Sequence, residues 1–133
     1  MSMFQALSIS GSGAEAMQTW IDTSAGNVAN MNDTVAVGKP AYGAQTPFLS
    51  PIATGGAGEA VQVARITIRT TKGIVTYQPT NPIANTQGDV IVPNVDLASQ
   101  LVGMLQAQEG YQADTAMMQK AMAAYTAGLT IGS

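Results

Sequence analysis

Residues 94–130 read NVDLASQLVGMLQAQEGYQADTAMMQKAMAAYTAGLT, and this stretch decides the fold. Large side chains recur along it at alternating steps of four and three residues. The positions of this C-terminal seam are Leu97, Leu101, Met104, Gln108, Tyr111, Thr115, Met118, Met122, Tyr125 and Leu129. Sustained spacing of this kind is typical of a coiled coil. We therefore predict a helix that is capped by Asn94 or Asp96 and ends at about Ala127.

The first part of the chain carries a second and less regular seam. The positions of this N-terminal seam are Leu7, Gly11, Ala14, Gln18, Ile21, Ala25 and Val28. We predict a helix from about Met3 to Ala29, ended by Asn30, because Asn tolerates the left-handed conformation used beyond helix ends. Glycine weakens an exposed helix by about 1 kcal/mol relative to Ala. At Gly11 the missing side chain would let another helix come close.

Charge is scarce on both predicted helices. Residues 1–30 and 94–133 together carry Glu15, Asp22, Asp96, Glu109, Asp114 and Lys120. A coiled coil that stands alone in water has charged outer faces, whereas the outer faces here consist of Ala, Gly, Ser, Thr, Gln and Met. We therefore expect that copies of the chain, or related proteins, cover these helices.

This expectation assigns particular positions on the second helix. Leu101 and Met118 are expected in the layer between helices, and Ala107, Ala116 and Ala123 are expected on outer faces near neighbouring subunits. Such an assembly would be heterologous, because a self-complementary contact closes after two copies. The alternative is an antiparallel helical hairpin that holds one small monomer together and leaves those faces in water.

The middle of the chain is predicted to contain short strands. Residues 33–59 are interrupted so often by Gly and Pro that we expect them to be irregular, with at most a short strand around 44–49. The best strand signal is EAVQVARITIRT at 59–70, and a turn at 71–73 would pair it with 74–77 in a hairpin. A third short strand is predicted at 88–92.

These elements predict an α+β fold with two long terminal helices packed as a coiled-coil-like hairpin. The helical domain would comprise residues 1–32 and 94–133. Residues 33–93 would form a small β-hairpin and loop insert between the helices.

Composition excludes several classes of function. The 133-residue chain contains no Cys and no His, and 10% of its residues are charged. No thiol, Ser-His or Cys-His nucleophile is available, and no metal-ligand spacing stands out. We therefore predict no catalytic residue, no metal and no cofactor. Without a basic patch or a long apolar run, we expect neither nucleic-acid binding nor a membrane span. The N-terminus MSMFQALSIS lacks the Lys or Arg of a Sec-type signal peptide.

Three stretches resemble flagellar axial proteins of the rod–hook family. AGNVANMNDT at 25–34 is similar to the SNxANxxT signature that ends their first helix. Residues 77–96 resemble the Y-x-P-x-N-P and P-N-V-D segment of the FlgC family of proximal rod proteins. GYQAD at 110–114 resembles that family's SYQAN segment. The matching residues are Asn27, Ala29, Asn30, Tyr77, Pro79, Asn81, Pro82, Pro93, Asn94, Asp96, Tyr111 and Gln112.

The departures from these motifs are local. Gly26 stands where the signature usually has Ser, and Asp33 takes the place of its Thr, with Thr34 one residue late. Gly110 and Asp114 stand where Ser and Asn are usual. The order of the motifs is unchanged, and they cover nearly the whole chain.

The resemblance implies a non-enzymatic structural subunit of the bacterial flagellar basal body. Such a subunit would be exported by the flagellar type III apparatus, without a cleaved signal peptide and without a small-molecule substrate. It would assemble with itself and other rod proteins into a helical tube, the periplasmic drive shaft that transmits motor torque for motility.

Two other interpretations stay open. The chain could be a different axial subunit, either another proximal rod protein or a hook-type protein, although the P-N-V-D stretch disfavours this. It could also be a small secreted helical hairpin that acts as an effector or chaperone. The β-rich middle disfavours that reading, because helices in such hairpins are joined by short loops.

Overall fold

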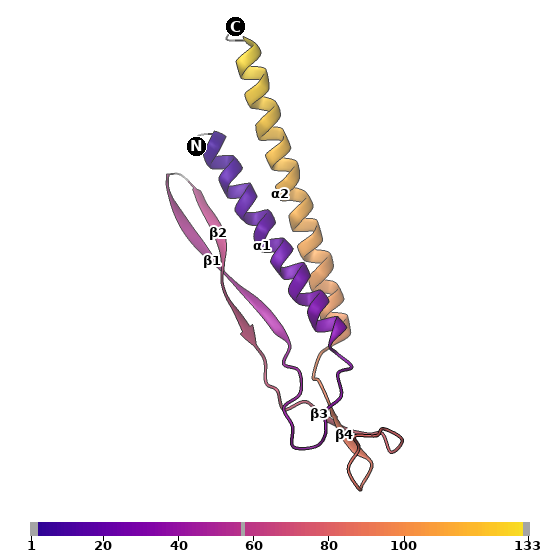
Figure 1. The fold of residues 1–133 in the computed structure, drawn as a ribbon. Coiled ribbons are helices and arrows are strands. Elements are labelled where there is room, and N and C mark those ends of the chain that lie inside the picture. Colours follow the sequence, from indigo (N-terminus) through magenta and orange to yellow (C-terminus); the bar gives the residue numbers. More distant parts are fainter. Residues whose placement is uncertain (1–2, 57, 132–133) are drawn as a thin grey trace.

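The computed structural model describes residues 3–56 and 58–131 (Figure 1). In chain order the elements are α1 (Met3–Ala29), β1 (Gln45–Gly56), β2 (Gly58–Ile68), β3 (Ile74–Tyr77), β4 (Asp89–Val92) and α2 (Leu97–Ile131). The two helices lie side by side and antiparallel, with two small antiparallel sheets between them in sequence. The predicted α+β class with two long terminal helices is confirmed. α1 has the predicted bounds, whereas α2 continues beyond the expected end at Ala127.

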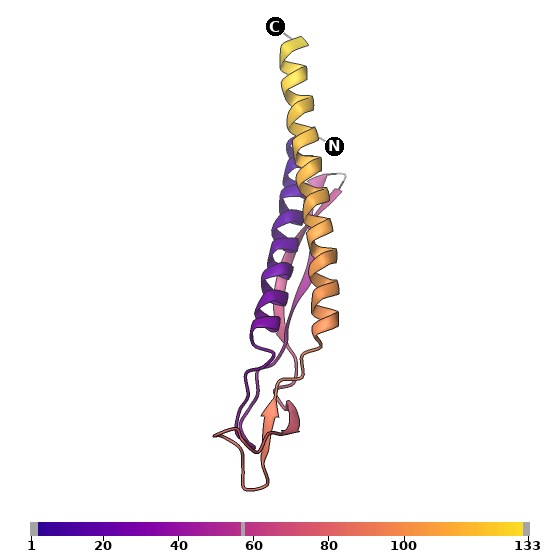
Figure 2. The same cartoon turned by 90° about the vertical axis from the view of Figure 1, so that its right-hand side faces the viewer.

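α1 is the middle layer of the molecule. α2 packs along one side of it, and the β1–β2 hairpin lies along another (Figures 1 and 2). Among the described elements, α2 packs against α1 alone. Neighbours on two sides leave little room, and the buried residues of α1 are accordingly small. They are Gly13, Ala14, Ala16, Thr23, Ser24 and Asn27.

The strands pair differently from the sequence-based expectation. β2 pairs antiparallel with β1, which precedes it, and β3 pairs with β4. The predicted hairpin between 59–70 and 74–77 is therefore wrong. Length explains the outcome, because β1 has 12 residues and β2 has 11, whereas β3 has only 4. Pairing with β1 gives β2 a much longer ladder of backbone hydrogen bonds.

β1 also corrects the prediction that residues 33–59 are irregular. It forms a long strand although it contains Pro47 and Pro51. Proline cannot donate a backbone hydrogen bond, which confines it to edge strands. In a sheet of two strands both strands are edges, and the sheet accommodates the two prolines. The predicted strand at 88–92 is confirmed as β4.

The loops and β4 form a compact base beyond the helix pair. Val35 forms an antiparallel bridge with Ile91 through two backbone hydrogen bonds of 2.9 Å. The N–H of Ala41 donates to the carbonyl of Thr71 at 2.8 Å, which ties the loop after α1 to the end of the long hairpin. Val90 is fully buried at the centre of this base.

The hydrophobic core of the chain is small. The largest side chains that are fully buried are Val90 and Asn27, and most other buried apolar residues are alanines. The accessible surface is 8448 Å², whereas a compact monomer of 13.6 kDa exposes about 6,600 Å². A single copy therefore leaves far more surface in water than a protein of its mass usually does.

Glycine substitutions test the packing of the helices and the base. At Gly11 an added Cβ meets nothing within 4 Å, and Ala is the better helix former. We expect Gly11→Ala to raise the free energy of unfolding by about 0.5–1 kcal/mol in urea titrations. Gly73 has a φ of 63°, and a Cβ there would lie 2.7 Å from the carbonyl oxygen of Val92. Gly73→Ala should therefore destabilise the chain, and a stabilising effect would contradict this packing.

Candidate assembly interface

The C-terminal end of α1 is fixed by one buried amide. The side chain of Asn27 is 1% exposed. Its Nδ2 donates to the carbonyl of Gln45 at 2.7 Å and to Oε1 of Gln100 at 2.9 Å. Its Oδ1 accepts from the hydroxyl of Tyr42 at 2.9 Å and from the N–H of Gln45 at 2.8 Å. Every hydrogen-bonding position of the amide is used, and the residue joins α1 to the loop, to β1 and to α2.

Two further groups support this junction. Burial raises the pKa of the Tyr42 hydroxyl, which keeps it in the neutral form that donates to Asn27. The carbonyl of Gly26 in the last turn of α1 accepts from the side chain of Asn30 at 2.7 Å and from the N–H of Asn30 at 3.1 Å. Ala29, the third matched residue of this motif, is exposed.

α2 begins at a carboxylate cap. Oδ2 of Asp96 accepts from the N–H of Ser99 at 3.1 Å and from the Ser99 hydroxyl. These hydrogen bonds lower the pKa of the Asp96 carboxyl. Of the two predicted capping residues, Asn94 and Asp96, it is therefore Asp96 that caps the helix. Asn94 is exposed.

The other residues of the 77–96 motif shape the base. The ring of Tyr77 and the Cβ of Pro79 lie over Gly88, where a Cβ would come within 2.6 Å of the tyrosine ring. Asn81 stabilises the loop by accepting from the N–H of Ile83 at 3.1 Å. Pro93 is buried between β4 and α2, and Pro82 is exposed.

The contact between the helices uses small side chains on α2. Gly103 faces Trp20 and Ser24, and Gly110 faces Met17. Ala107, between them, is 0% exposed and is the only residue of α2 that is buried in the described chain. Gln100 at one end bonds Asn27, and Asp114 at the other lies against Gly13.

The α2 residues at this contact, 100, 103, 107, 110 and 114, also recur at steps of three and four. Each of them directly precedes a residue of the predicted C-terminal seam. One residue is a rotation of about 100° around a helix. The C-terminal seam therefore lies beside the contact with α1. Met104 and Met118 are half-buried, and Leu101 is 47% exposed. The other seam residues with large exposed side chains are Leu97, Tyr111, Met122, Tyr125 and Leu129.

The prediction for Ala107 is wrong. It was expected on an outer face, but it fills the closest part of the contact with α1. Ala116 and Ala123 are exposed in the single chain. The spacing of Gly103, Ala107 and Gly110 is the sequence signal that could have identified the contact face, because small residues let two helix backbones approach closely.

The N-terminal seam is divided between several surroundings. Ala14 is buried, and Leu7, Ile21 and Val28 are half-buried. Gly11 faces open space, and the close approach occurs at Gly13 instead. Gln112, the remaining matched motif residue, is exposed on α2.

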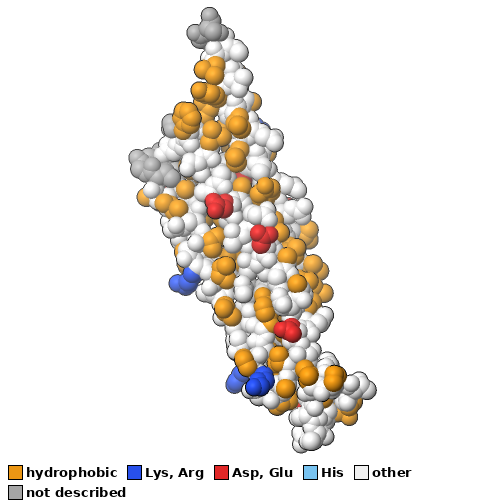
Figure 3. Space-filling view, viewed as in Figure 1, with side chains coloured by type: hydrophobic (Ala, Val, Ile, Leu, Met, Phe, Trp, Pro, Cys, Tyr) orange, Lys and Arg blue, Asp and Glu red, His pale blue; other side chains and the backbone are white. Residues whose placement is uncertain are grey.

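The molecule displays much apolar surface for its few charges. Orange side chains are scattered over the helices and the strands in Figure 3, with isolated red and blue groups between them. α2 exposes apolar groups along its whole length, among them Val102, Leu105 and Met117. No described helix is sufficiently long and apolar to span a membrane. Within residues 3–56 and 58–131, acidic side chains form no cluster suited to a metal ion.

Comparisons with known proteins point to one kind of protein. Residues 86–123 match the family model of the C-terminal region of flagellar basal body rod FlgEFG proteins. The chain is 31% identical over 115 residues to the flagellar basal-body rod protein FlgC of Aquifex aeolicus, covering 86% of this chain and 85% of the relative. It is 29% identical over 133 residues to FlgC of Escherichia coli O6:H1, and 28% identical over 151 aligned residues to FlgC of Bacillus subtilis. Each of these two matches covers 99% of both chains.

The Asn27 junction can be tested by truncation of its side chain. Asn27→Ala leaves the buried partners on Gln45, Gln100 and Tyr42 without a hydrogen bond, and each such group costs about 1–3 kcal/mol. We expect the free energy of unfolding, measured in urea, to fall by at least about 2 kcal/mol. The exposed Asn94 is the matched control, and Asn94→Ala should change stability by less than about 0.5 kcal/mol. Equal effects would contradict the assigned role of Asn27.

The Asp114 carboxyl should give stability an unusual pH dependence. Burial against α1 raises its pKa above the ordinary value of 3.8, and the folded chain therefore binds this proton more tightly than the unfolded chain. The resulting stability is fully present below the unfolded pKa and is lost as pH rises through the folded pKa. We expect Asp114→Asn to stabilise the chain at pH 7 and to have a smaller effect near pH 3.

Asp96 provides the opposite control. Its lowered pKa gives stability that is present above the unfolded value and is lost as pH falls through the folded pKa. Asp96→Asn should therefore destabilise the chain at pH 7. Urea titrations between pH 3 and pH 7 measure both effects. A stabilisation by Asp114→Asn that did not vary with pH would refute the assignment.

Proposed function

Because the chain belongs to the FlgC family of flagellar basal-body rod proteins and is a structural subunit of that rod, we propose that it assembles with itself and other rod proteins into a helical tube. The tube crosses the periplasm and transmits motor torque. The flagellar type III apparatus exports the subunit, and no signal peptide is cleaved. Its role is architectural and involves no chemical reaction.

The observation that carries this proposal is the small core and large exposed surface of the single chain. Its surface of 8448 Å² exceeds the value of about 6,600 Å² for a compact monomer of this mass. Specific interfaces between proteins bury about 1,200–2,000 Å² in total. Each partner contributes about 800 Å² of such an interface, so the excess of about 1,800 Å² on one chain corresponds to about two contacts with neighbouring subunits.

The position of the C-terminal seam supports the same proposal. α2 already closes the hairpin with Gly103, Ala107 and Gly110, which leaves Leu101 and its seam neighbours beside that contact. Another subunit therefore has to cover these seam side chains. Contacts of this kind must be heterologous to build a tube, because an isologous pair would close as a dimer.

The two alternative interpretations have less support. A small secreted effector or chaperone would not explain full-length similarity to rod proteins. A different axial subunit would not explain why the full-length relatives carry the name FlgC. The motif residues contribute by fixing the shape of the subunit, since Asn27 joins three elements and Asp96 starts α2.

Leu101 allows assembly to be separated from folding. Its side chain is 47% exposed in the single chain, and Leu101→Asp should change the free energy of unfolding by about 0.5 kcal/mol or less. In the proposed tube the same change buries an unpaired charge, which is strongly unfavourable. We expect no rods and no swimming when Leu101→Asp replaces the wild-type chain in cells that lack their own copy.

Two controls complete this experiment. Gln112→Asp places the same charge on another exposed part of α2 and should support swimming. Ala107→Asp puts a charge into the contact between α1 and α2 and should destabilise even the purified chain. Normal rods built from the Leu101→Asp variant would overturn the proposed cover of the seam.

A further inference from the structure

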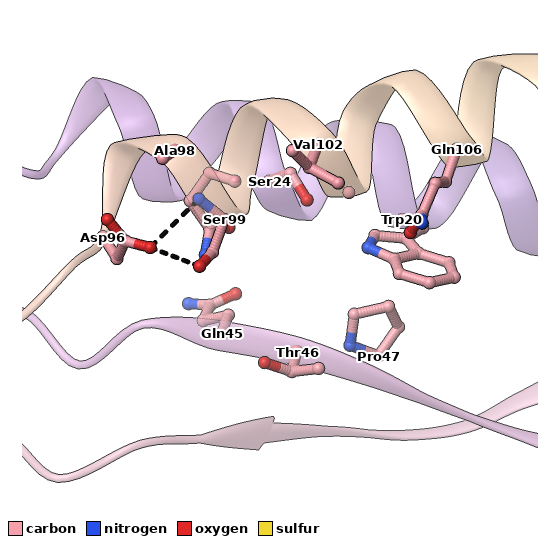
Figure 4. Close-up of a pocket in the computed structure, with 12 residues that line it drawn as sticks. Trp20, Ser24, Gln45, Thr46, Pro47, Asp96, Ala98, Ser99, Val102 and Gln106 are labelled. Atoms are coloured by element: carbon pink, nitrogen blue, oxygen red, sulfur yellow. Dashed lines mark hydrogen bonds between the residues drawn. The ribbon is translucent and has the colours of Figure 1, made fainter.

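A groove lies where α1, β1 and the start of α2 meet. It has a volume of about 510 Å³ and is lined by Trp20 of α1, Pro47 of β1 and Val102 of α2, among others. Figure 4 shows Trp20 and Pro47 close together at one end of the groove, with Asp96 and Gln45 at the other. The groove is therefore built by three elements and not by a single helix face.

The groove suits an uncharged occupant. Asp96 is its one charged lining residue, and the Asp96 carboxylate already accepts two hydrogen bonds from Ser99. Gln100 is engaged with Asn27. Among the described residues, no buried side-chain nitrogen or oxygen lacks a hydrogen-bond partner. The half-buried indole of Trp20 offers a large apolar surface, and the side-chain amides of Gln45 and Gln106, which also line the groove, can donate to carbonyls.

The chain itself contains a segment with matching properties. Residues 121–133 carry no charge. The ring of Tyr125 contacts the ring of Phe4 near the start of α1, with 6.1 Å between the ring centroids. Beyond Tyr125, α2 extends past Met3, the described start of α1 (Figure 1). Leu129 is 57% exposed and Ile131 is 86% exposed.

Helix chemistry adds a second point of complementarity. An α-helix leaves its last four carbonyls without partners inside the helix. The amide groups of Gln45 and Gln106 in the groove are uncharged donors that suit such carbonyls. A helix end with apolar side chains therefore suits both the indole of Trp20 and the amide donors of the groove.

We propose that the C-terminal end of α2, residues 126–131, docks in the Trp20 groove of a second copy of the chain. The groove lies beside the first turns of α2 and the docking segment is its last turn. In each contact, one copy therefore contributes the C-terminal end of α2 and the other copy contributes the groove near the start of α2. The contact is heterologous and leaves an unfilled groove and a free end after each addition, as a growing polymer requires. This inference rests on the proposed rod function and specifies one of its contacts.

Cross-linking in cells tests the contact directly. The chain contains no Cys, and introduced cysteines are therefore the sole thiols in it. Gln106→Cys places a thiol at the groove, and Ala127→Cys places one on the docking segment. Cells whose swimming depends on this chain are treated with a short bismaleimide. We expect the double variant to give a ladder of its own multimers, and a mixture of the two single variants to give dimers.

A matched control pair uses the same docking cysteine. Gln112 is an exposed Gln of α2 outside both the groove and the seam, about 240° around the helix from Gln106. Gln112→Cys with Ala127→Cys should give no ladder. Cross-linking of the Gln106→Cys chain to a different rod protein, or the absence of any adduct, would overturn docking between copies. Failure of the wild-type chain to restore swimming would instead count against the rod function.

Fluorescence provides a second measurement that does not depend on introduced cysteines. Trp20 is the single tryptophan of the chain, and filling the groove removes its indole from water. The emission of the purified full-length chain should shift to shorter wavelength as its concentration rises. The shift should disappear in the Leu129→Ser, Ile131→Ser double variant, whose changes lie on exposed positions. An equal shift in the double variant, or no shift in the wild type, would overturn the proposal.

Discussion

The fold depends on one buried amide. Asn27 uses both oxygen lone pairs and both N–H groups to hold α1, the loop at Tyr42, the start of β1 and the start of α2 in one arrangement. In most domains a cluster of large apolar side chains has this task, but here the largest fully buried side chains are Asn27 and Val90. A fully satisfied polar network fixes geometry closely, because any shift leaves a buried group unpaired. The subunit thus obtains a defined shape with little hydrophobic burial.

Sequence periodicity predicted the helices well and their contact poorly. The bounds Met3–Ala29 are predicted correctly, and Asp96 is one of the two residues predicted to cap α2. The contact face was missed because periodicity analysis weights large apolar residues, whereas the helices meet through Gly103, Ala107 and Gly110. Large apolar residues identify the helix face that exposes the most apolar surface to water. In a subunit made for assembly, that face need not belong to the contact within the chain.

The strands show a different limit of sequence reasoning. Pro47 and Pro51 made the region before β2 look irregular, although each is acceptable in a two-stranded sheet. The pairing of β2 with β1 depends on the matched lengths of the two strands, which local turn signals do not reveal. The four hydrogen bonds of Asn27 could not be predicted from the sequence either, because its partners lie 15, 18 and 73 residues away along the chain. The motif that contains Asn27 identified the family, but not the role of its amide.

The small core also has a mechanical consequence. A partner that binds the folded state and not the unfolded state shifts the folding equilibrium toward the folded state. Stability that comes from neighbouring subunits is therefore present only after those subunits bind. One free copy is then easy to pull into an extended thread, because few large side chains have to be separated. The same copy within an assembly resists unfolding together with all the contacts around it. Such a protein is easily deformed as a free copy and stiff once assembled, with no change in its covalent structure.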